Sequence, residues 1–192
     1  MKEEQKILDV GCGSLKFKDS IGIDIISNSN VDIVHDLNMY PWPFEDNSFD
    51  RIIFKHSISH MNNIIDTMNE VHRILRKSGI VDILAPHFSS DNYFTDPTHN
   101  FSLGYRSMYY FCDNIINWKY KYTQNSFKLV KSYISFREYK IDFNFTEYSN
   151  SFNPLQIFYI EWLINKYPRI YEKYFSNIIT ASEVFFRLKC IK

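Results

Sequence analysis

The sequence predicts an α/β fold in which a mostly parallel sheet carries helices on its faces. Short apolar runs alternate with polar or helical segments as far as residue 86, which is typical of parallel strands joined by crossovers. The first run leads directly into Gly11-Cys12-Gly13, and the second run ends at Asp24. Glycines after a first strand and an acid after a second strand are typical of α/β folds that bind a ligand at the ends of the strands.

The first half of the chain supplies five expected strands and one expected helix. The strands are expected at 6–10, 21–25, 31–35, 49–56 and 80–86. Apolar residues recur at helical spacing over 61–77, and Ser78-Gly79 is expected to end that helix. The connection from Gly13 to Ile21 holds at most a turn or two of helix, so we expect a shortened first crossover.

The second half is less periodic, although one domain is still expected over residues 1–192. Residues 87–126 are polar and aromatic, and we expect an insertion with short helices over the carboxyl edge of the sheet. An extended segment is expected at 127–141, and a helix at 154–167 that ends before Pro168. Residues 182–191 alternate as a last strand, which is expected to pair antiparallel with the extended segment.

Composition disfavours nucleic-acid-binding, secreted and membrane-spanning proteins. The chain has 22 basic and 22 acidic residues, without the basic excess that most nucleic-acid binders carry, so nucleic acid is a disfavoured partner. The charged N-terminus does not resemble a signal peptide, and no apolar run reaches the ~20 residues of a membrane span. The three cysteines lie far apart, without the spacing of a disulfide framework. We therefore expect a cytoplasmic protein.

The glycine motif indicates a nucleoside-containing cofactor. Glycines let the backbone approach a ligand closely, and Asp24 can accept both ribose hydroxyls of an adenosine group. A dinucleotide motif would have a third glycine where this chain has Lys16, and the shortened helix offers little to a pyrophosphate. These features favour S-adenosylmethionine over a nicotinamide cofactor. The alternative is that Gly11 and Gly13 only make a tight turn.

Four segments in order carry a family resemblance. ILDVGCG, GIDI, HDLNMYPWPFEDNSFDRIIFKHSISHM and EVHRILRKSGIVDILAPHF together resemble the class I S-adenosylmethionine-dependent methyltransferase superfamily, in its methyltransferase-11-like branch. The resemblance covers about residues 6–100. It implies a Rossmann-like three-layer sandwich with a seven-stranded sheet, in which the last strand is antiparallel and lies at one edge. The branch usually has Glu-His where this chain has Ser59-His60, which puts any role of that glutamate in doubt here.

The resemblance also implies site residues. Asp9, Gly11 and Gly13 would flank the methionine part of the cofactor, and His56 would face the reaction centre. Asp24 would hold the ribose, with Asp36 and Leu37 beside the adenine. The full cofactor-binding set that we expect is Asp9, Gly11, Cys12, Gly13, Asp24, Ile25, Asp36, Leu37 and Lys55.

The segment after the fifth strand is expected to bind the methyl acceptor. For an alcohol acceptor, His99 or His87 would act as general base, because imidazole accepts protons near neutral pH. Asp96 would orient an imidazole. In the structural alternative, Asp96 caps a turn before Pro97 and His99 donates to a backbone carbonyl. The DPTH segment resembles methyltransferases of surface-glycan and secondary-metabolite pathways, which favours O-methylation of a small molecule such as a sugar or glycan precursor.

Several alternatives remain open at this level. A divalent metal could be held by His87, Asp91, Asp96 and His99, with His56 as a further donor, but their spacing matches no recognised ligand motif. We therefore favour catalysis without a metal. A cofactor-binding partner subunit without activity is a second function class, and a nicotinamide-dependent oxidoreductase is a third. The sequence is compatible with a homodimer.

Overall fold

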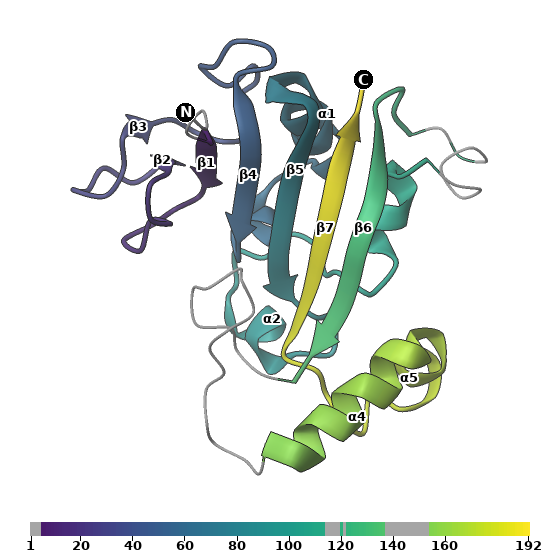
Figure 1. Ribbon diagram of the computed structural model, residues 1–192. Helices are drawn as coiled ribbons and strands as arrows, with labels where there is room; N and C mark the ends of the chain where they lie inside the picture. The colour runs from purple at the N-terminus through teal and green to yellow at the C-terminus, as the bar shows by residue number, and fades with distance from the viewer. Residues whose placement is uncertain (1–4, 114–119, 121, 137–153) are drawn as a thin grey trace.

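The computed structural model describes residues 5–113, 120, 122–136 and 154–192. A seven-stranded sheet has the strand order β3-β2-β1-β4-β5-β7-β6 (Figure 1). The strands are β1 (Ile7–Val10), β2 (Ile21–Asp24), β3 (Ile33–Val34), β4 (Phe49–Lys55), β5 (Leu75–Pro86), β6 (Ser126–Ser135) and β7 (Glu183–Ile191). The helices are α1 (Ile64–Ile74), α2 (Asp91–Thr95), α4 (Pro154–Lys166) and α5 (Pro168–Tyr174), with 3-10 turns η1 (Ile58–His60) and η2 (Ser107–Phe111).

The pairing confirms the predicted α/β class with a mostly parallel sheet. Strands β1 to β5 pair in parallel, and β7 runs antiparallel to both β5 and β6. The antiparallel last strand is confirmed, but its expected place at the edge is wrong, because β6 is the edge strand and β7 lies inside it. This position brings the first residue of β7 to the end of β5, where Glu183 pairs with Pro86.

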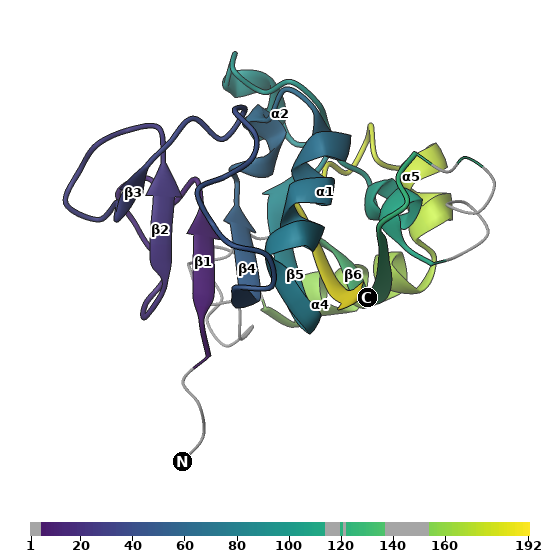
Figure 2. The ribbon, with the colours of Figure 1, turned by 90° about the horizontal axis from the view of Figure 1, so that it is seen from above.

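The early crossovers are short, as expected for the first of them. Residues 11–20 between β1 and β2 form turns without a helix, and residues 25–32 and 35–48 also contain no helix. Helix α1 covers one face of the sheet beside β5, as Figure 2 shows. The loops after β1, β2 and β3 are therefore free to shape the carboxyl edge of the sheet.

Helix α1 is shorter than predicted at both ends. Asn63 begins it, because its side chain accepts hydrogen bonds from the backbone N–H groups of Ile65 and Asp66. The expected stop at Ser78-Gly79 is wrong, because Leu75 already has extended backbone angles and pairs with Phe49 of β4. Leu75 is fully buried, so packing in the core overrides the helical spacing of its sequence.

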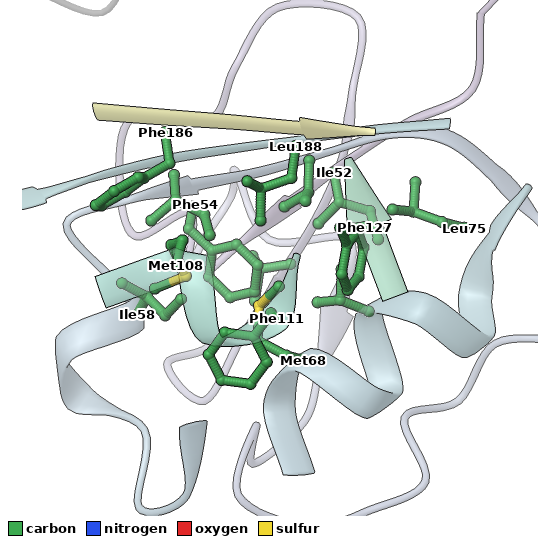
Figure 3. Close-up of a cluster of buried hydrophobic side chains, with 14 of the residues drawn as sticks. Ile52, Phe54, Ile58, Met68, Leu75, Met108, Phe111, Phe127, Phe186 and Leu188 are labelled. Atoms are coloured by element: carbon green, nitrogen blue, oxygen red, sulfur yellow. The ribbon is translucent and has the colours of Figure 1, made fainter. Parts of the chain in front are cut away.

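The main core lies between the sheet and the elements on the α1 face. Figure 3 shows Phe54 of β4, Phe186 and Leu188 of β7 and Met68 of α1 converging in one cluster, joined by Met108 and Phe111 of η2. The insertion expected at 87–126 therefore contributes core residues as well as surface ones, within the described range 87–113. Residues 114–119 and 121 lie outside the described part.

The last helices end at the carboxyl edge of the sheet. Figure 1 shows α4 and α5 at the same end of the sheet as α2. Asn165 of α4 pairs with the backbone of Ile134 at 2.8 Å in both directions, which anchors the helix to β6. Pro168 does follow α4 closely, but it also begins α5, which the sequence analysis did not predict. Of the extended segment expected at 127–141, residues 127–135 lie in β6, and 137–141 are outside the described residues. No helix in the described residues is long and apolar enough to cross a membrane.

A buried ion cluster joins β4, β5 and β7. The fully buried Asp82 accepts hydrogen bonds from Arg51 at 2.8 and 2.5 Å and from Arg187 at 2.6 and 2.9 Å. Two cations on one carboxylate satisfy both of its oxygens, and the pKa of Arg187 is raised chiefly by its hydrogen bond to Asp82. The cluster therefore ties the antiparallel strand to the parallel part of the sheet.

We expect Asp82→Ala to lower the free energy of unfolding by about 3 kcal/mol, because it leaves two partly buried guanidinium groups without their anion. Urea denaturation measures this change. The matched control is Asp46→Ala, because Asp46 also pairs with an arginine, at 2.7 Å, but is largely exposed. That surface pair is expected to contribute at most about 1 kcal/mol. Equal losses in the two variants would contradict a structural role for the buried cluster.

Candidate functional site

A cavity of about 580 Å³ lies at the carboxyl ends of β1, β2 and β4, and we call it the glycine cavity. Its volume is within the range of pockets that bury cofactor-sized ligands. It is lined by Gly11, Asp24, Ile25, Ile26, Asp36, Leu37, Asn38, Lys55, His56, Ser57, His60, Met61 and Thr98. Ligands of open α/β sheets bind at this edge, in the crevice beyond the strand ends.

Asp24, the last residue of β2, is held in place by two hydrogen bonds from the backbone. One carboxylate oxygen accepts the backbone N–H of Gly13 at 2.8 Å, and the other accepts that of Ile26 at 3.0 Å. Each carboxylate oxygen can accept two hydrogen bonds, so each retains one acceptor position. The side chain is nearly buried but lines the cavity, which suits it to accept a pair of vicinal hydroxyls.

Gly11 and Ser57 pack tightly where β1 and β4 end. Gly11 has φ +67°, and a Cβ there would lie 2.4 Å from Ser57 Cβ. Gly13 has φ +55°, but a Cβ there would meet nothing within 4 Å. The first glycine is therefore required by both backbone angle and space, whereas the second is required by backbone angle alone.

Two opposite charges lie behind this turn. Oδ2 of the buried Asp9 accepts the backbone N–H of Phe17 at 2.7 Å, whereas Oδ1 has no hydrogen-bond partner among the described residues. Burial raises the pKa of Asp9, and burial lowers the pKa of Lys55, while each charge partly opposes the effect of burial on the other. Lys55 lines the cavity, so a cation and a buried acceptor lie close to its glycine end.

The expected cofactor-binding residues divide into two groups. Gly11, Asp24, Ile25, Asp36, Leu37 and Lys55 line the cavity, whereas Asp9, Cys12 and Gly13 do not. Gly13 supports the site indirectly, through its N–H on Asp24, and burial raises the pKa of the Cys12 thiol to about 11. Sequence reasoning missed six lining residues: Ile26, Asn38, Ser57, His60, Met61 and Thr98. Ser57, His60 and Met61 could have been predicted as lining residues, because they lie in the turn that follows the fourth strand.

A second cavity of about 660 Å³ adjoins the first, and we call it the histidine cavity. His56 and His60 line both cavities, so a ligand in one would lie beside a ligand in the other. The histidine cavity is lined by His56, His60, Pro86, Asn92, Thr95, Asp96, Pro97, His99 and Glu183. It therefore combines the end of β4 with α2, the DPTH segment and the start of β7.

His56 occupies a strained position between the cavities. Its φ is +60°, a left-handed conformation that non-glycine residues seldom adopt away from functional sites. Nε2 of His56 lies 2.8 Å from a carboxylate oxygen of Glu183, which is almost fully buried at the start of β7. This contact has the distance of an ion pair but not the geometry of a hydrogen bond, so it places a buried carboxylate beside the imidazole without deciding which ring nitrogen carries the proton. Sequence reasoning missed Glu183, because only the β5–β7 register places it here.

The DPTH segment brings three ligand-type side chains together. One donor atom from each of His60, Asp96 and His99 lies within 4.8 Å of the others. Asp96 accepts the backbone N–H of Thr98 at 2.9 Å, and His99 Nδ1 lies 2.9 Å from the carbonyl oxygen of Tyr93. These are the turn contacts expected if Asp96 and His99 have only a structural role. Each contact occupies one polar atom of the side chain, Oδ1 of Asp96 and Nδ1 of His99.

Two residues expected on the acceptor side lie elsewhere. His87 is fully buried, with Nδ1 2.8 Å from Ser89 Oγ and Nε2 3.4 Å from Glu172, and it does not line the histidine cavity. Asp91 begins α2 and is also absent from the cavity lining. His87 follows the last residue of β5, and its ring packs against Phe88 and Tyr171 in the interior instead of facing the cavity. The set His87, Asp91, Asp96 and His99 therefore does not form one cluster.

Comparisons with known proteins agree with this geometry. Residues 8–83 match the model of a family described as "Methyltransferase domain". No curated protein matches the sequence. Among solved structures, a SAM-dependent methyltransferase from Archaeoglobus fulgidus is 21% identical, with a TM-score of 0.60 over 98% of this chain and 87% of that one. A SAM-dependent methyltransferase from Thermotoga maritima, described as a possible histamine N-methyltransferase, is 15% identical (TM-score 0.55, 98% and 83% covered). A putative methyltransferase from Bacillus halodurans is 13% identical (TM-score 0.54, 100% and 95% covered).

At these identities the solved structures establish the fold, whereas the family match covers the sequence of the glycine turn and the strands around it. The strand order, the glycine cavity and the matched residues are mutually consistent. The chain is thus similar over residues 8–83 to the family described as "Methyltransferase domain", and its fold is that of the S-adenosylmethionine-dependent methyltransferases among the solved structures.

Proposed function

We propose that this protein transfers a methyl group from S-adenosylmethionine to a hydroxyl of a small, polar molecule such as a sugar or glycan precursor. The observation that carries the proposal is the pair of adjoining cavities that share His56 and His60. One cavity has the features of a nucleoside site, and the other holds polar side chains suited to an acceptor. The shared wall is where a methyl group would pass between the two ligands.

The residues present fit the cofactor. Asp24 would accept the ribose hydroxyls through its two remaining acceptor positions, and Asp36 and Leu37 would lie beside the adenine. Lys55 lines the cavity, and its ammonium group would bind the carboxylate group of the methionine end. The cofactor, when bound, supplies a methyl group on a positively charged sulfur.

The protein side of the reaction is positioning and proton removal. The acceptor oxygen would form its bond to the methyl carbon as the carbon–sulfur bond of the cofactor breaks, and the sulfur would be left as a neutral thioether. Holding both reactants in line can supply much of the rate enhancement. His56 takes the hydroxyl proton, because its imidazole lies between the cavities and the carboxylate of Glu183, 2.8 Å from Nε2, would stabilise the positive charge that the ring gains. The expectation that His99 or His87 is the base is thereby revised in favour of His56.

The lining of the histidine cavity supports a polar acceptor. Asn92 and Thr95 of α2 and Asp96 contribute hydrogen-bonding groups, and Pro86 and Pro97 are its apolar members. A polyhydroxylated molecule matches this composition better than an apolar one, because buried polar groups require partners. The DPTH resemblance to methyltransferases of glycan pathways points in the same direction.

Binding of S-adenosylhomocysteine tests the cofactor assignment. Asp24→Ala is expected to weaken it by about 1.5–3 kcal/mol, the scale of hydrogen bonds to a charged group. Calorimetric titration of the folded proteins gives this difference. Asp32→Ala is the control, because Asp32 also accepts a backbone N–H hydrogen bond, from Gly22 of β2, but does not line the cavity. Unchanged affinity in Asp24→Ala would contradict the ribose assignment, and tighter binding of NAD than of S-adenosylhomocysteine by the wild type would favour an oxidoreductase. Cofactor binding without methylation of any hydroxylated acceptor would favour a non-catalytic subunit.

A further inference from the structure

We propose that His60, Asp96 and His99 bind a divalent transition-metal ion in the histidine cavity. The three side chains come from η1 and from the DPTH segment, which are far apart in sequence. All three side chains line the histidine cavity, and two imidazoles and one carboxylate would leave further coordination positions of an ion for other ligands. That donor set is typical of zinc, cobalt or iron, and not of magnesium or calcium, which prefer oxygen ligands.

The spacing of the donor atoms suits an ion after a small closure. One donor atom of each side chain lies within 4.8 Å of the others. Metal–ligand bonds of roughly 2.0–2.2 Å place neighbouring ligand atoms about 3–4 Å apart. Asp96 is exposed and the two histidines are only partly buried, so their side chains can close this gap without disturbing the core. The imidazole rings of His60 and His99 already lie with centroids 4.6 Å apart.

The hydrogen bond of His99 to the backbone leaves its other ring nitrogen able to bind a metal ion. Its Nδ1 lies 2.9 Å from the carbonyl oxygen of Tyr93, and a carbonyl oxygen only accepts hydrogen bonds. Nδ1 must therefore carry the proton, which leaves the lone pair of the neutral ring on Nε2. An imidazole that donates one N–H to a backbone carbonyl and offers its other nitrogen is the usual arrangement of a metal-bound histidine.

Thr98 prepares His60 in the same way. The hydroxyl of Thr98 donates its only proton to Oδ1 of Asp96, at 2.7 Å, because a carboxylate can only accept. Thr98 Oγ1 is also 2.9 Å from Nδ1 of His60, so in that contact it must accept. His60 therefore carries its proton on Nδ1 and offers Nε2, while Oδ2 of Asp96 remains available. Thr98 thus fixes the tautomer of His60 and holds one carboxylate oxygen of Asp96.

The ion would act on the methyl acceptor. His60 and Thr98 also line the glycine cavity, so an ion held here lies between the two binding sites. Coordination of the acceptor oxygen would orient it toward the methyl group and make its proton easier for His56 to remove. This role depends on the proposed methyl transfer, whereas the metal site itself does not.

Direct metal binding tests the proposal. The full-length chain is treated with chelator and titrated with Co²⁺, followed by visible absorption, and then with Zn²⁺ by calorimetry. We expect one ion per chain, with Zn²⁺ displacing Co²⁺. Thr98→Val removes a residue that only hydrogen-bonds to the ligands, so it should weaken Co²⁺ binding by ~10–100-fold. His99→Ala and Asp96→Ala each remove a ligand, so each should weaken Co²⁺ binding by more than that.

Two matched controls accompany these variants. His35→Ala removes an imidazole that lines neither cavity, and Thr95→Val removes a hydroxyl that bonds to the backbone of Asp91. Both should keep wild-type Co²⁺ affinity. The proposal is overturned if the wild type binds no stoichiometric Co²⁺, or if His99→Ala and Asp96→Ala bind it as the wild type does. S-adenosylhomocysteine affinity, measured on the same samples, separates this result from a failure of the proposed function, because the cofactor site does not require the ion.

Discussion

Replacing His56 with asparagine is expected to lower turnover by about 10²–10⁴-fold, the usual contribution of a general base. Asparagine is chosen because it tolerates the left-handed backbone of this position, so the variant loses the imidazole without added strain. The loss should appear in kcat, since the acceptor and the cofactor keep their other contacts. Single-turnover assays with S-adenosylmethionine and a hydroxylated acceptor measure the chemical step.

A companion variant tests how Glu183 acts. Glu183→Gln should lower turnover less than His56→Asn, because Glu183 orients the imidazole and does not itself take the proton. His35→Asn serves as the control, since His35 bonds to the carbonyl of Met39 and lines neither cavity. Wild-type turnover in His56→Asn would return the role of base to His99, as the sequence analysis first favoured.

Replacing Gly11 with alanine is expected to abolish cofactor binding and to destabilise the fold by about 2–5 kcal/mol. The left-handed backbone contributes about 1–2 kcal/mol of this loss. Overpacking contributes about 1–3 kcal/mol, because the new Cβ would lie 2.4 Å from Ser57 Cβ. Ser57 cannot move away freely, since its hydroxyl is hydrogen-bonded to the carbonyl of Val10. Urea denaturation and calorimetry with S-adenosylhomocysteine give the two losses separately.

Gly13→Ala supplies the matched comparison. Its backbone angle is similar, at φ +55°, but a Cβ there meets nothing within 4 Å. Only the backbone cost of about 1–2 kcal/mol is expected. The double variant Gly11→Ala/Ser57→Gly should recover part of the lost stability, because it removes the clashing side chain. Equal effects at the two glycines would show that close packing against Ser57 has no part in the requirement for Gly11.

The residues at strand ends that line the glycine cavity could be predicted from the sequence. The signals there are local: a buried strand followed by Gly11, and an acid that ends the next strand at Asp24. Parallel pairing then brings such strand ends to one edge of the sheet without further information. The family resemblance added Asp36 and Leu37, which line the glycine cavity together with Lys55, the last residue of β4.

Only the tertiary structure decided which residues line the histidine cavity. Residues 87–99 have no clear period, so the sequence could not show that His87 turns into the core while His99 turns into a cavity. Glu183 reaches His56 because β7 runs antiparallel beside β5, which brings the start of one strand to the end of the other. The meeting of His60 with Asp96 and His99 likewise depends on two loops that are separate in sequence. Sequence patterns specify which strand ends form a site, whereas contacts between distant segments are fixed by packing, and packing selects which polar side chains meet.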